Sequence, residues 1–306
     1  MITWKLWSAL YHPPADHPVF RRFAAPHAAS RPRRVPLLIF AGLLAAYLCY
    51  QITLFQSPVG MLFTFSPLEF LTVAVTFNLS YGVVLVVTVS LAIATAHEGG
   101  IYEALCLTPS GAPGINWAMC TGALYRRPGL EWFRLGITLL SLVLLIALTI
   151  HFTVPVIGLG NAALQRSVRP EETRFYAQMF LDLTYAYMLI AAFYAGTIQT
   201  VVMGVLVGMV TAATNNISMV RYWSVGTFLL LQLFSVLIAL IFSLLLPTIY
   251  PFFGFAGFLA ELSIPICRFV FFFAVREILN AALWQMLLRQ LNAERDLSTA
   301  WAGGQV

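Results

Sequence analysis

Long apolar runs with almost no charge constrain this chain more than any other feature of its sequence. Several stretches of 20 or more residues are built almost entirely from hydrophobic side chains. A helix of about 20 apolar residues is long enough to cross the hydrocarbon core of a bilayer. Only 9% of the 306 residues are charged, whereas a soluble domain carries roughly a quarter of its residues as charged side chains. The sequence therefore predicts an all-α, polytopic membrane protein.

The apolar runs predict six transmembrane helices. They cover approximately residues 35–55, 68–94, 135–159, 188–210, 223–246 and 252–275. The fourth run begins at Phe175 and would be roughly 58 Å long as a helix, so its first turns should project beyond a hydrocarbon core of about 30 Å.

Three parts of the chain follow from these spans. Residues 1–34 form a cytosolic or interfacial segment, in which Trp4, Trp7 and Tyr11 share one face of a short helix that would lie in the membrane interface. Residues 35–275 form the six-helix domain, with an inner loop at 96–134. Residues 276–306 form an amphipathic cytosolic tail.

The position of the sixth span has an alternative. A span that starts at Ile266 would leave residues 252–259 as a re-entrant hairpin. It would also place Arg276 and Glu277 near the middle of the membrane, at a cost of roughly 2.5–3.5 kcal/mol each before any pairing. This cost favours the span at 252–275.

The distribution of basic residues predicts the orientation. With the N-terminus inside, 13 Lys and Arg residues lie on the inner side and 3 on the outer side. Such a bias places both termini in the cytosol of a bacterial-type inner membrane, with the lipid bilayer as a partner. The net charge of +5 is too scattered to indicate nucleic-acid binding.

Several kinds of catalytic and metal site are excluded by the residues present. A P-loop requires a lysine, and the sole lysine is Lys5 in the N-terminal segment. His97-Glu98 begins like a zinc-protease motif, but Ile101 stands where the second histidine is needed. His97, Cys106 and Cys120 are too widely spaced to favour a metal site. We therefore expect no catalytic residue, no metal and no enzymatic activity in this chain.

One segment of the inner loop carries a candidate docking site. Tyr102 to Leu107 are expected to form a short helix after a glycine pair, with Tyr102 and Leu105 on one face and Glu103 on the other. Thr108-Pro109 ends the helix. A short amphipathic helix at the cytosolic side of a membrane domain suits docking to a soluble partner.

The docking segment has the form E-x-G-x-x-E-x-L-x-L-T-P. Its matching residues are Glu98, Gly100, Glu103, Leu105, Leu107, Thr108 and Pro109, followed directly by Ser110. This pattern resembles the coupling-helix signature of ABC transporter permeases of the type-two exporter class. Ile101 and Tyr102 stand where members of that class usually carry Thr or Ser and then Leu.

A second segment and the layout agree with this resemblance. Residues 16–22, DHPVFRR, are similar to the N-P-[VI]-x-x-[KR]-E element that precedes the first span in the same class, although Phe23 replaces its acidic residue. The order of elements also matches: an N-terminal interfacial helix, six spans, and a coupling loop between the second and third spans. The resemblance covers the layout of nearly the whole chain, but its motifs cover only about 15 residues.

The resemblance implies a function and partners. The chain would be the permease subunit of an ABC-type exporter, paired with a second permease subunit and driven by a separate ATPase that binds the ATP. The chain itself would need no cofactor. Glu98 and Glu103 would meet basic residues of the ATPase, and Tyr102, Leu105 and Leu107 would fill its apolar groove. Residues 214–222, with Arg221, would form a second inner contact.

Other interpretations stay open. The chain could be a permease-like structural subunit of a larger membrane complex without transport activity. A membrane enzyme acting on lipids is less favoured, because Asp182 and His151 are dispersed. Arg268 is an intramembrane charge and so a candidate functional residue, although it could also extend to the membrane surface. The sequence does not indicate the substrate.

Overall fold

The computed structural model describes residues 1–25, 67–106, 111–126, 170–212, 217–249 and 258–291, and every regular element in them is a helix. The helices are α1 (Ile2–Tyr11), α2 (Pro18–Ala24), α5 (Pro67–Glu98), α6 (Ile101–Cys106), α7 (Gly111–Tyr125), α9 (Pro170–Ala212), α10 (Ile217–Ile249) and α11 (Phe258–Gln290). The all-α prediction is confirmed for these residues.

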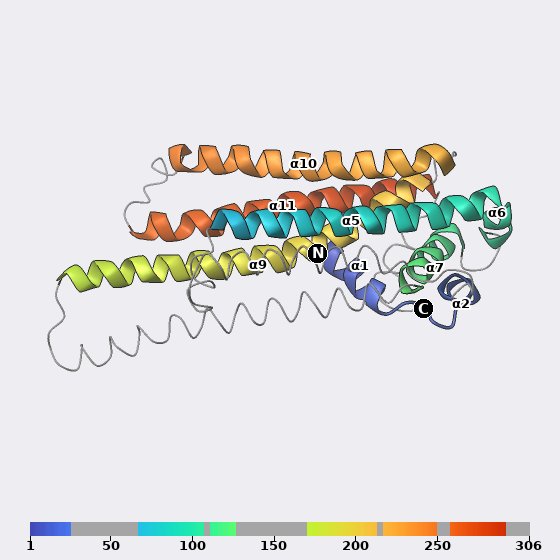
Figure 1. Cartoon of the computed structure of the whole chain (residues 1–306), viewed down its shortest axis with the longest axis horizontal. Helices are drawn as coiled ribbons and strands as arrows, with labels where there is room; N and C mark the ends of the chain where they lie inside the picture. The colour runs from blue at the N-terminus through green and yellow to red at the C-terminus, as the bar shows by residue number, and fades with distance from the viewer. Residues whose placement is uncertain (26–66, 107–110, 127–169, 213–216, 250–257, 292–306) are drawn as a thin grey trace, which may run out of the picture.

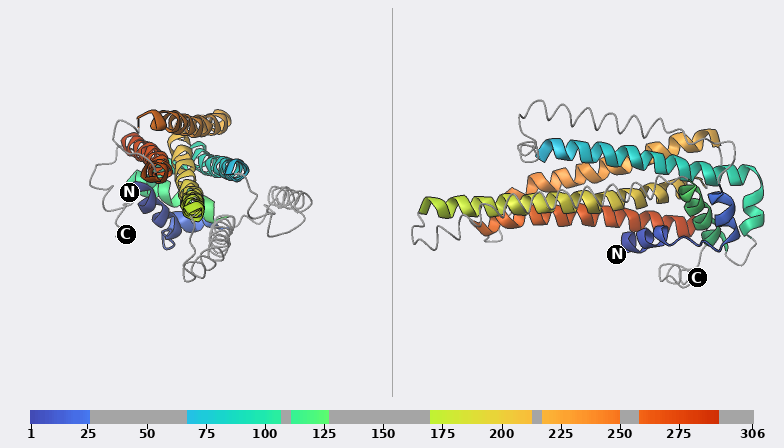
Figure 2. Two further views of the ribbon diagram at one scale, coloured as in Figure 1. Left: turned by 90° about the vertical axis from the view of Figure 1, so that its left-hand side faces the viewer. Right: turned by 60° about the horizontal axis from the view of Figure 1, so that its bottom comes forward.

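Four long helices form an elongated bundle. α5, α9, α10 and α11 run along its length, and α9 contacts the other three (Figure 1). The short helices α2, α6 and α7 gather at one end, where α5 ends and α10 begins (Figures 1 and 2). We call this end of the molecule the α6–α7 end.

Three of the long helices can cross a membrane. Their apolar segments are Asn78–Glu98 in α5, Ile190–Ala212 in α9 and Met219–Ile249 in α10, by length and composition. They coincide with the second, fourth and fifth predicted spans and indicate a membrane protein. The first and third predicted spans lie outside the described residues, and α11, which covers most of the sixth, is not among these three segments, so six spans are not confirmed.

Small residues allow α9 to approach α5 closely. A Cβ atom added to Gly208 would lie 2.9 Å from the Cβ of Val89 and 3.1 Å from the carbonyl oxygen of Val86. A Cβ added to Gly204 would lie 3.3 Å from the carbonyl oxygen of Gly82. Gly204 and Gly208 thus form a G-x-x-x-G pair, which brings helices together in membranes because there is no side chain between the backbones.

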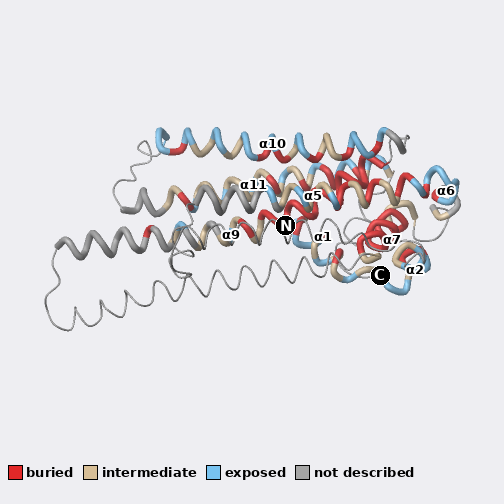
Figure 3. Tube along the Cα trace, in the orientation of Figure 1, coloured by how far each residue is buried: buried red, intermediate tan, exposed pale blue. Residues whose placement is uncertain are grey.

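The most apolar helix, α10, is buried along one stripe only. Ser224, Phe228, Gln232 and Ser235 are buried at a spacing of three or four residues and face the bundle. The opposite face exposes large apolar side chains, including Leu230 (67% exposed), Leu233 (65%) and Leu244 (69%), and appears as the pale stretches of α10 in Figure 3. In a membrane protein such a face suits contact with lipid.

Helix α11 passes through the boundary that the sequence suggested at residue 275. It continues without a break to Gln290, and Arg276, Asn280, Trp284 and Leu287 are buried at the spacing of one helix face. Arg276 lies between α9 and α10, because it donates hydrogen bonds to Gly196 and Gln232. Arg276 therefore lies inside the bundle, whereas the sequence assigned residues 276–306 to a tail outside the six-helix domain.

The N-terminal helix α1 packs against α9 and α11. Thr3, Leu6 and Leu10 form its buried face, whereas Trp4 is 39% exposed on the other side. Trp7 contacts Tyr11 edge to face, and Trp4, one turn earlier, is exposed. α1 contacts the bundle through Leu6 and Leu10 and through hydrogen bonds of Thr3 to α11.

Candidate functional site

The predicted docking helix is present at the α6–α7 end. α5 ends at Glu98, the chain turns at Gly99-Gly100, and α6 begins at Ile101. Gly100 has a φ of 64°, a conformation that residues with a Cβ rarely adopt, so glycine suits this turn. The observed helix, 101–106, begins and ends one residue before the predicted one.

Tyr102 fixes α6 to its neighbours. Its side chain is only 9% exposed, and its hydroxyl oxygen accepts a hydrogen bond of 2.6 Å from Asn116 Nδ2 in α7. Its ring lies 3.7 Å from the imidazole ring of His97 at the end of α5, measured between centroids. This placement does not fit a side chain that fills a groove on a partner. It fits one that holds α6 on α5 and α7.

The outward residues of this segment are Glu98, Gly99, Gly100 and Ile101, all of them exposed. Leu105 is half-buried. Glu103 belongs to α6, but its side chain lies outside the described set, as do Leu107, Thr108, Pro109 and Ser110. Within the described residues, the surface that a partner could contact consists of the start of α6 and the turn that precedes it.

The second predicted contact lies at the same end of the bundle. Arg221 is exposed in the first turns of α10. One turn later, the hydroxyl of Ser224 lies 3.3 Å from the hydroxyl of Ser90 in α5, and both residues are buried. Since Ser90 is eight residues before the end of α5, this contact brings Arg221 to the end that carries α6.

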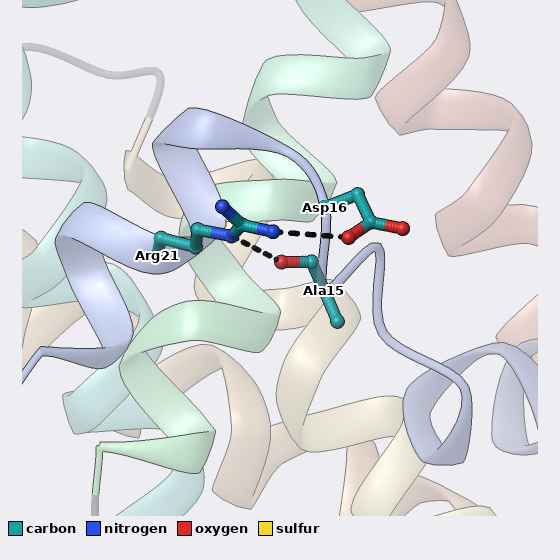
Figure 4. A network of polar contacts seen from close by, with 3 residues as sticks. All are labelled: Ala15, Asp16 and Arg21. Atoms are coloured by element: carbon teal, nitrogen blue, oxygen red, sulfur yellow. Dashed lines mark hydrogen bonds and ion pairs between the residues drawn. The ribbon is translucent and has the colours of Figure 1, made fainter.

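The segment at residues 16–22 forms the start of α2. His17 caps the helix, accepting a hydrogen bond of 3.3 Å from the backbone N–H of Val19, and Pro18 occupies the first turn. Arg21 binds Asp16 through a 3.0 Å ion pair and donates to the carbonyl of Ala15 (Figure 4). These contacts close the loop that joins α1 to α2.

Helix α2 packs directly on α7. A Cβ added to Gly122 in α7 would lie 2.8 Å from the Cβ of Phe23 and 3.0 Å from the carbonyl oxygen of Phe20. Tyr125 in α7 donates a 3.0 Å hydrogen bond to the carbonyl of Leu10 in α1. The N-terminal helices and the docking helix are therefore attached to the same element, α7.

Comparisons of the chain with protein-family models, with curated proteins and with solved structures found no match. The resemblance to ABC permeases therefore stays a prediction from the residues named above.

A buried polar cluster in the bundle was not predicted as a site. Arg276 Nη1 donates a 2.9 Å hydrogen bond to the carbonyl of Gly196, and Nη2 donates to Gln232 Oε1. The guanidinium carbon lies 5.1 Å from the centre of the Phe272 ring. One arginine thus links α9, α10 and α11 at a position where the side chain is 4% exposed.

The same cluster extends to α1. Asn280 Nδ2 donates to Thr3 Oγ1 at 3.0 Å, and the backbone N–H of Thr3 donates to Glu277 Oε1 at 3.1 Å. Because Thr3 is in the first turn of α1, the carboxylate of Glu277 acts as a cap for that helix from across the fold. Gln199 Nε2 also donates to the carbonyl of Phe273 at 3.0 Å. The signal in the sequence was one polar residue within each of three apolar segments: Gln199 in α9, Gln232 in α10 and Arg276 in α11.

Arg268, the intramembrane charge singled out in the sequence, contacts α10. Its Nη2 donates a 3.2 Å hydrogen bond to the carbonyl of Ser243, and its side chain is half-buried. The described residues contain no group of three or more His, Cys, Asp or Glu side chains that could hold a metal ion.

Proposed function

We propose that this chain is the membrane-spanning permease subunit of an ABC-type exporter and that it works with a separate ATPase subunit. It would pair with a second permease subunit, with both termini in the cytosol of a bacterial-type inner membrane. One observation carries the proposal: a short helix of the resembling sequence lies at the tip of a long apolar helix and is held there by buried contacts.

The attachment of α6 supports a role in transmitting force. Tyr102 joins α6 to α7 through Asn116 and to α5 through His97. α5 in turn packs along α9, with backbone approaches at Gly204 and Gly208 that leave no room for an added side-chain atom without a shift. A displacement of α6 by a partner would therefore move α5 and α9 together.

The outward residues of this region suit a protein partner. Glu98 supplies an exposed negative charge next to Ile101, a large apolar side chain that is 36% exposed at the start of α6. An exposed apolar residue beside a charge is typical of a small interface centre with a polar rim. Arg221, at the same end, supplies a positive charge for a second contact.

The test is recovery of an ATPase with the chain purified from its native membranes. The wild-type chain is expected to retain a protein that contains a P-loop and hydrolyses ATP. Glu103→Arg and Ile101→Arg are expected to lose it, because each places a cation on the proposed contact surface. Ser8→Arg is the control, since it places a cation on an exposed position of α1 away from the proposed contact surface and should retain the ATPase.

The outcome also separates transport from a structural role. ATP-dependent movement of a substrate across reconstituted vesicles supports the permease. A retained ATPase whose hydrolysis neither needs the chain nor moves a substrate would favour the structural subunit. Recovery of no ATPase with the wild-type chain, or equal recovery with Ile101→Arg, would contradict the proposal.

A further inference from the structure

Arg268 lies close to one edge of the hydrocarbon core, within a side-chain length of the lipid headgroups. Its hydrogen-bond partner, Ser243, is six residues before Ile249, the end of the apolar segment of α10. That distance is about 9 Å along a helix. The segment has 31 residues, or about 46 Å, so a segment centred on a hydrocarbon core of about 30 Å extends about 8 Å beyond it on each side. Ser243 and Arg268 therefore lie at the edge of the hydrocarbon core.

The guanidinium of Arg268 has hydrogen-bonding capacity left over. Among the described residues, Nη2 donates to a neutral carbonyl and Nε is enclosed by protein without a hydrogen bond, so Nη1 is the nitrogen left for a ligand. The ion pair recorded within the described part of the chain joins Arg21 and Asp16, far from this position. A cation at the edge of a low-dielectric region gains most from an anion, and an arginine fork suits the paired oxygens of a phosphate.

The surroundings of Arg268 suit acyl chains. On α10, Leu244 is 69% exposed and Leu245 is 50% exposed; on α11, Val270 is 56% exposed. One turn deeper, the rings of Phe242 and Phe271 stack at 3.7 Å between centroids and close the seam between the two helices. A headgroup that enters this seam from the bilayer would therefore stop at Arg268.

We propose that the seam between α10 and α11 binds an anionic glycerophospholipid, with Arg268 binding its phosphate and the exposed apolar side chains of both helices contacting its acyl chains. This site depends on neither the ATPase nor transport. It goes beyond the proposed function and would stand if that function were wrong.

The test compares two lipids with identical acyl chains on the full chain in detergent after removal of native lipid. Native mass spectrometry is expected to show dioleoylphosphatidylglycerol binding about tenfold more tightly than dioleoylphosphatidylcholine, since one hydrogen bond to a charged group corresponds to a factor of about ten or more. Arg268→Gln should remove this preference, and Arg268→Lys should keep part of it. Arg289→Gln is the control, because Arg289 is an exposed arginine at the other end of α11.

Three results would overturn the proposal. Equal binding of the two lipids to the wild-type chain would do so without any variant, so the test does not depend on the folding of Arg268→Gln. An equal loss of preference in Arg289→Gln would indicate attraction to the overall positive charge. Displacement of the lipid by millimolar inorganic phosphate would assign Arg268 to a free anion instead of a lipid.

Discussion

Replacing Gln232 by leucine tests whether Arg276 is held by its contact with α10. Leucine keeps a similar volume but removes Oε1, which accepts from Arg276 Nη2. The guanidinium is 4% exposed, so water cannot take over the lost contact. A hydrogen bond to a charged group contributes about 1.5–3 kcal/mol, and a buried charged donor left without a partner costs at least as much. We expect Gln232→Leu to lower the free energy of unfolding by about 2–3 kcal/mol.

The double variant makes this expectation specific. Once Gln232 is leucine, changing Arg276 to methionine removes the stranded charge, and an apolar pair of similar volume can match or exceed the stability of a buried polar pair. We expect Arg276→Met/Gln232→Leu to be more stable than Gln232→Leu alone, with an interaction energy of about 2 kcal/mol. This expected interaction energy is larger than that of hydrogen-bonded pairs between membrane helices, which averages about 0.6 kcal/mol and reaches about 1.7 kcal/mol, because the donor here is charged.

The measurement is reversible unfolding of the purified chain in mixed micelles, with increasing sodium dodecyl sulfate and circular dichroism as the signal. Ser235→Ala is the matched control. Ser235 is buried on the same face of α10, but its hydroxyl donates to a carbonyl of its own helix. Additive effects of the two substitutions, within about 0.5 kcal/mol, would refute the reasoning.

Three further outcomes follow from the packing. Gly208→Ala should destabilise the chain by about 1–3 kcal/mol in the same unfolding assay, because its Cβ overlaps α5; Gly226→Ala, which meets nothing within 4 Å, should be neutral or stabilising by up to about 1 kcal/mol. Burial raises the pKa of the Cys120 thiol, so little of it is thiolate at pH 8. In a variant with the other two cysteines replaced by serine, maleimide should therefore modify half-buried Cys267 before Cys120. Faster modification of Cys120 would contradict its burial. Tyr102→Phe should cost about 1–2 kcal/mol in the unfolding assay, because the buried amide of α7 loses the hydroxyl that accepts its hydrogen bond; an unchanged stability would argue against this attachment of α6.

The sequence predicted those features that depend on neighbouring residues. Hydropathy located the span of α10 at 223–246, and the apolar segment in the structure is Met219–Ile249. The glycine pair and the threonine-proline pair located α6 to within one residue. The glycine and threonine-proline pairs depend only on local backbone conformation, and hydropathy depends only on the composition of one segment. These features could therefore be predicted without knowledge of the fold.

The direction of side chains around α6 could not be predicted in the same way. Tyr102 and Leu105 are three residues apart and lie on one face, as expected, but periodicity does not say whether that face meets a partner or the chain itself. The answer depends on Asn116 of α7, which lies 14 residues further along the chain and binds the hydroxyl of Tyr102. A helix of six residues offers too few positions for its pattern to separate the two possibilities.

The burial of Arg276 inside the bundle could not be predicted, for an energetic reason. From the sequence alone, Arg276 carries its full cost in a membrane, because its hydrogen-bond partners are 80 and 44 residues away along the chain. Two hydrogen bonds and the Phe272 ring offset much of that cost. The G-x-x-x-G pair at Gly204 and Gly208 was visible in the sequence and would have indicated that α9 is the central helix.

The contacts of α11 place its charges at consistent depths. Gln232 is 13 residues from Met219 and 17 from Ile249, so it lies within about 3 Å of the middle of that segment, and Arg276 lies at the same level. Arg268 is then about 12 Å from the middle toward one surface, and Arg289 about 20 Å from it toward the other. With a hydrocarbon half-thickness of about 15 Å, Arg268 is at one edge of the core and Arg289 is outside it, which agrees with the exposure of Arg289. Trp284, about 12 Å from the middle, contacts Trp117 of α7 edge to face. Arg276 joins α9, α10 and α11, so loss of its partners is expected to weaken the packing of all three helices.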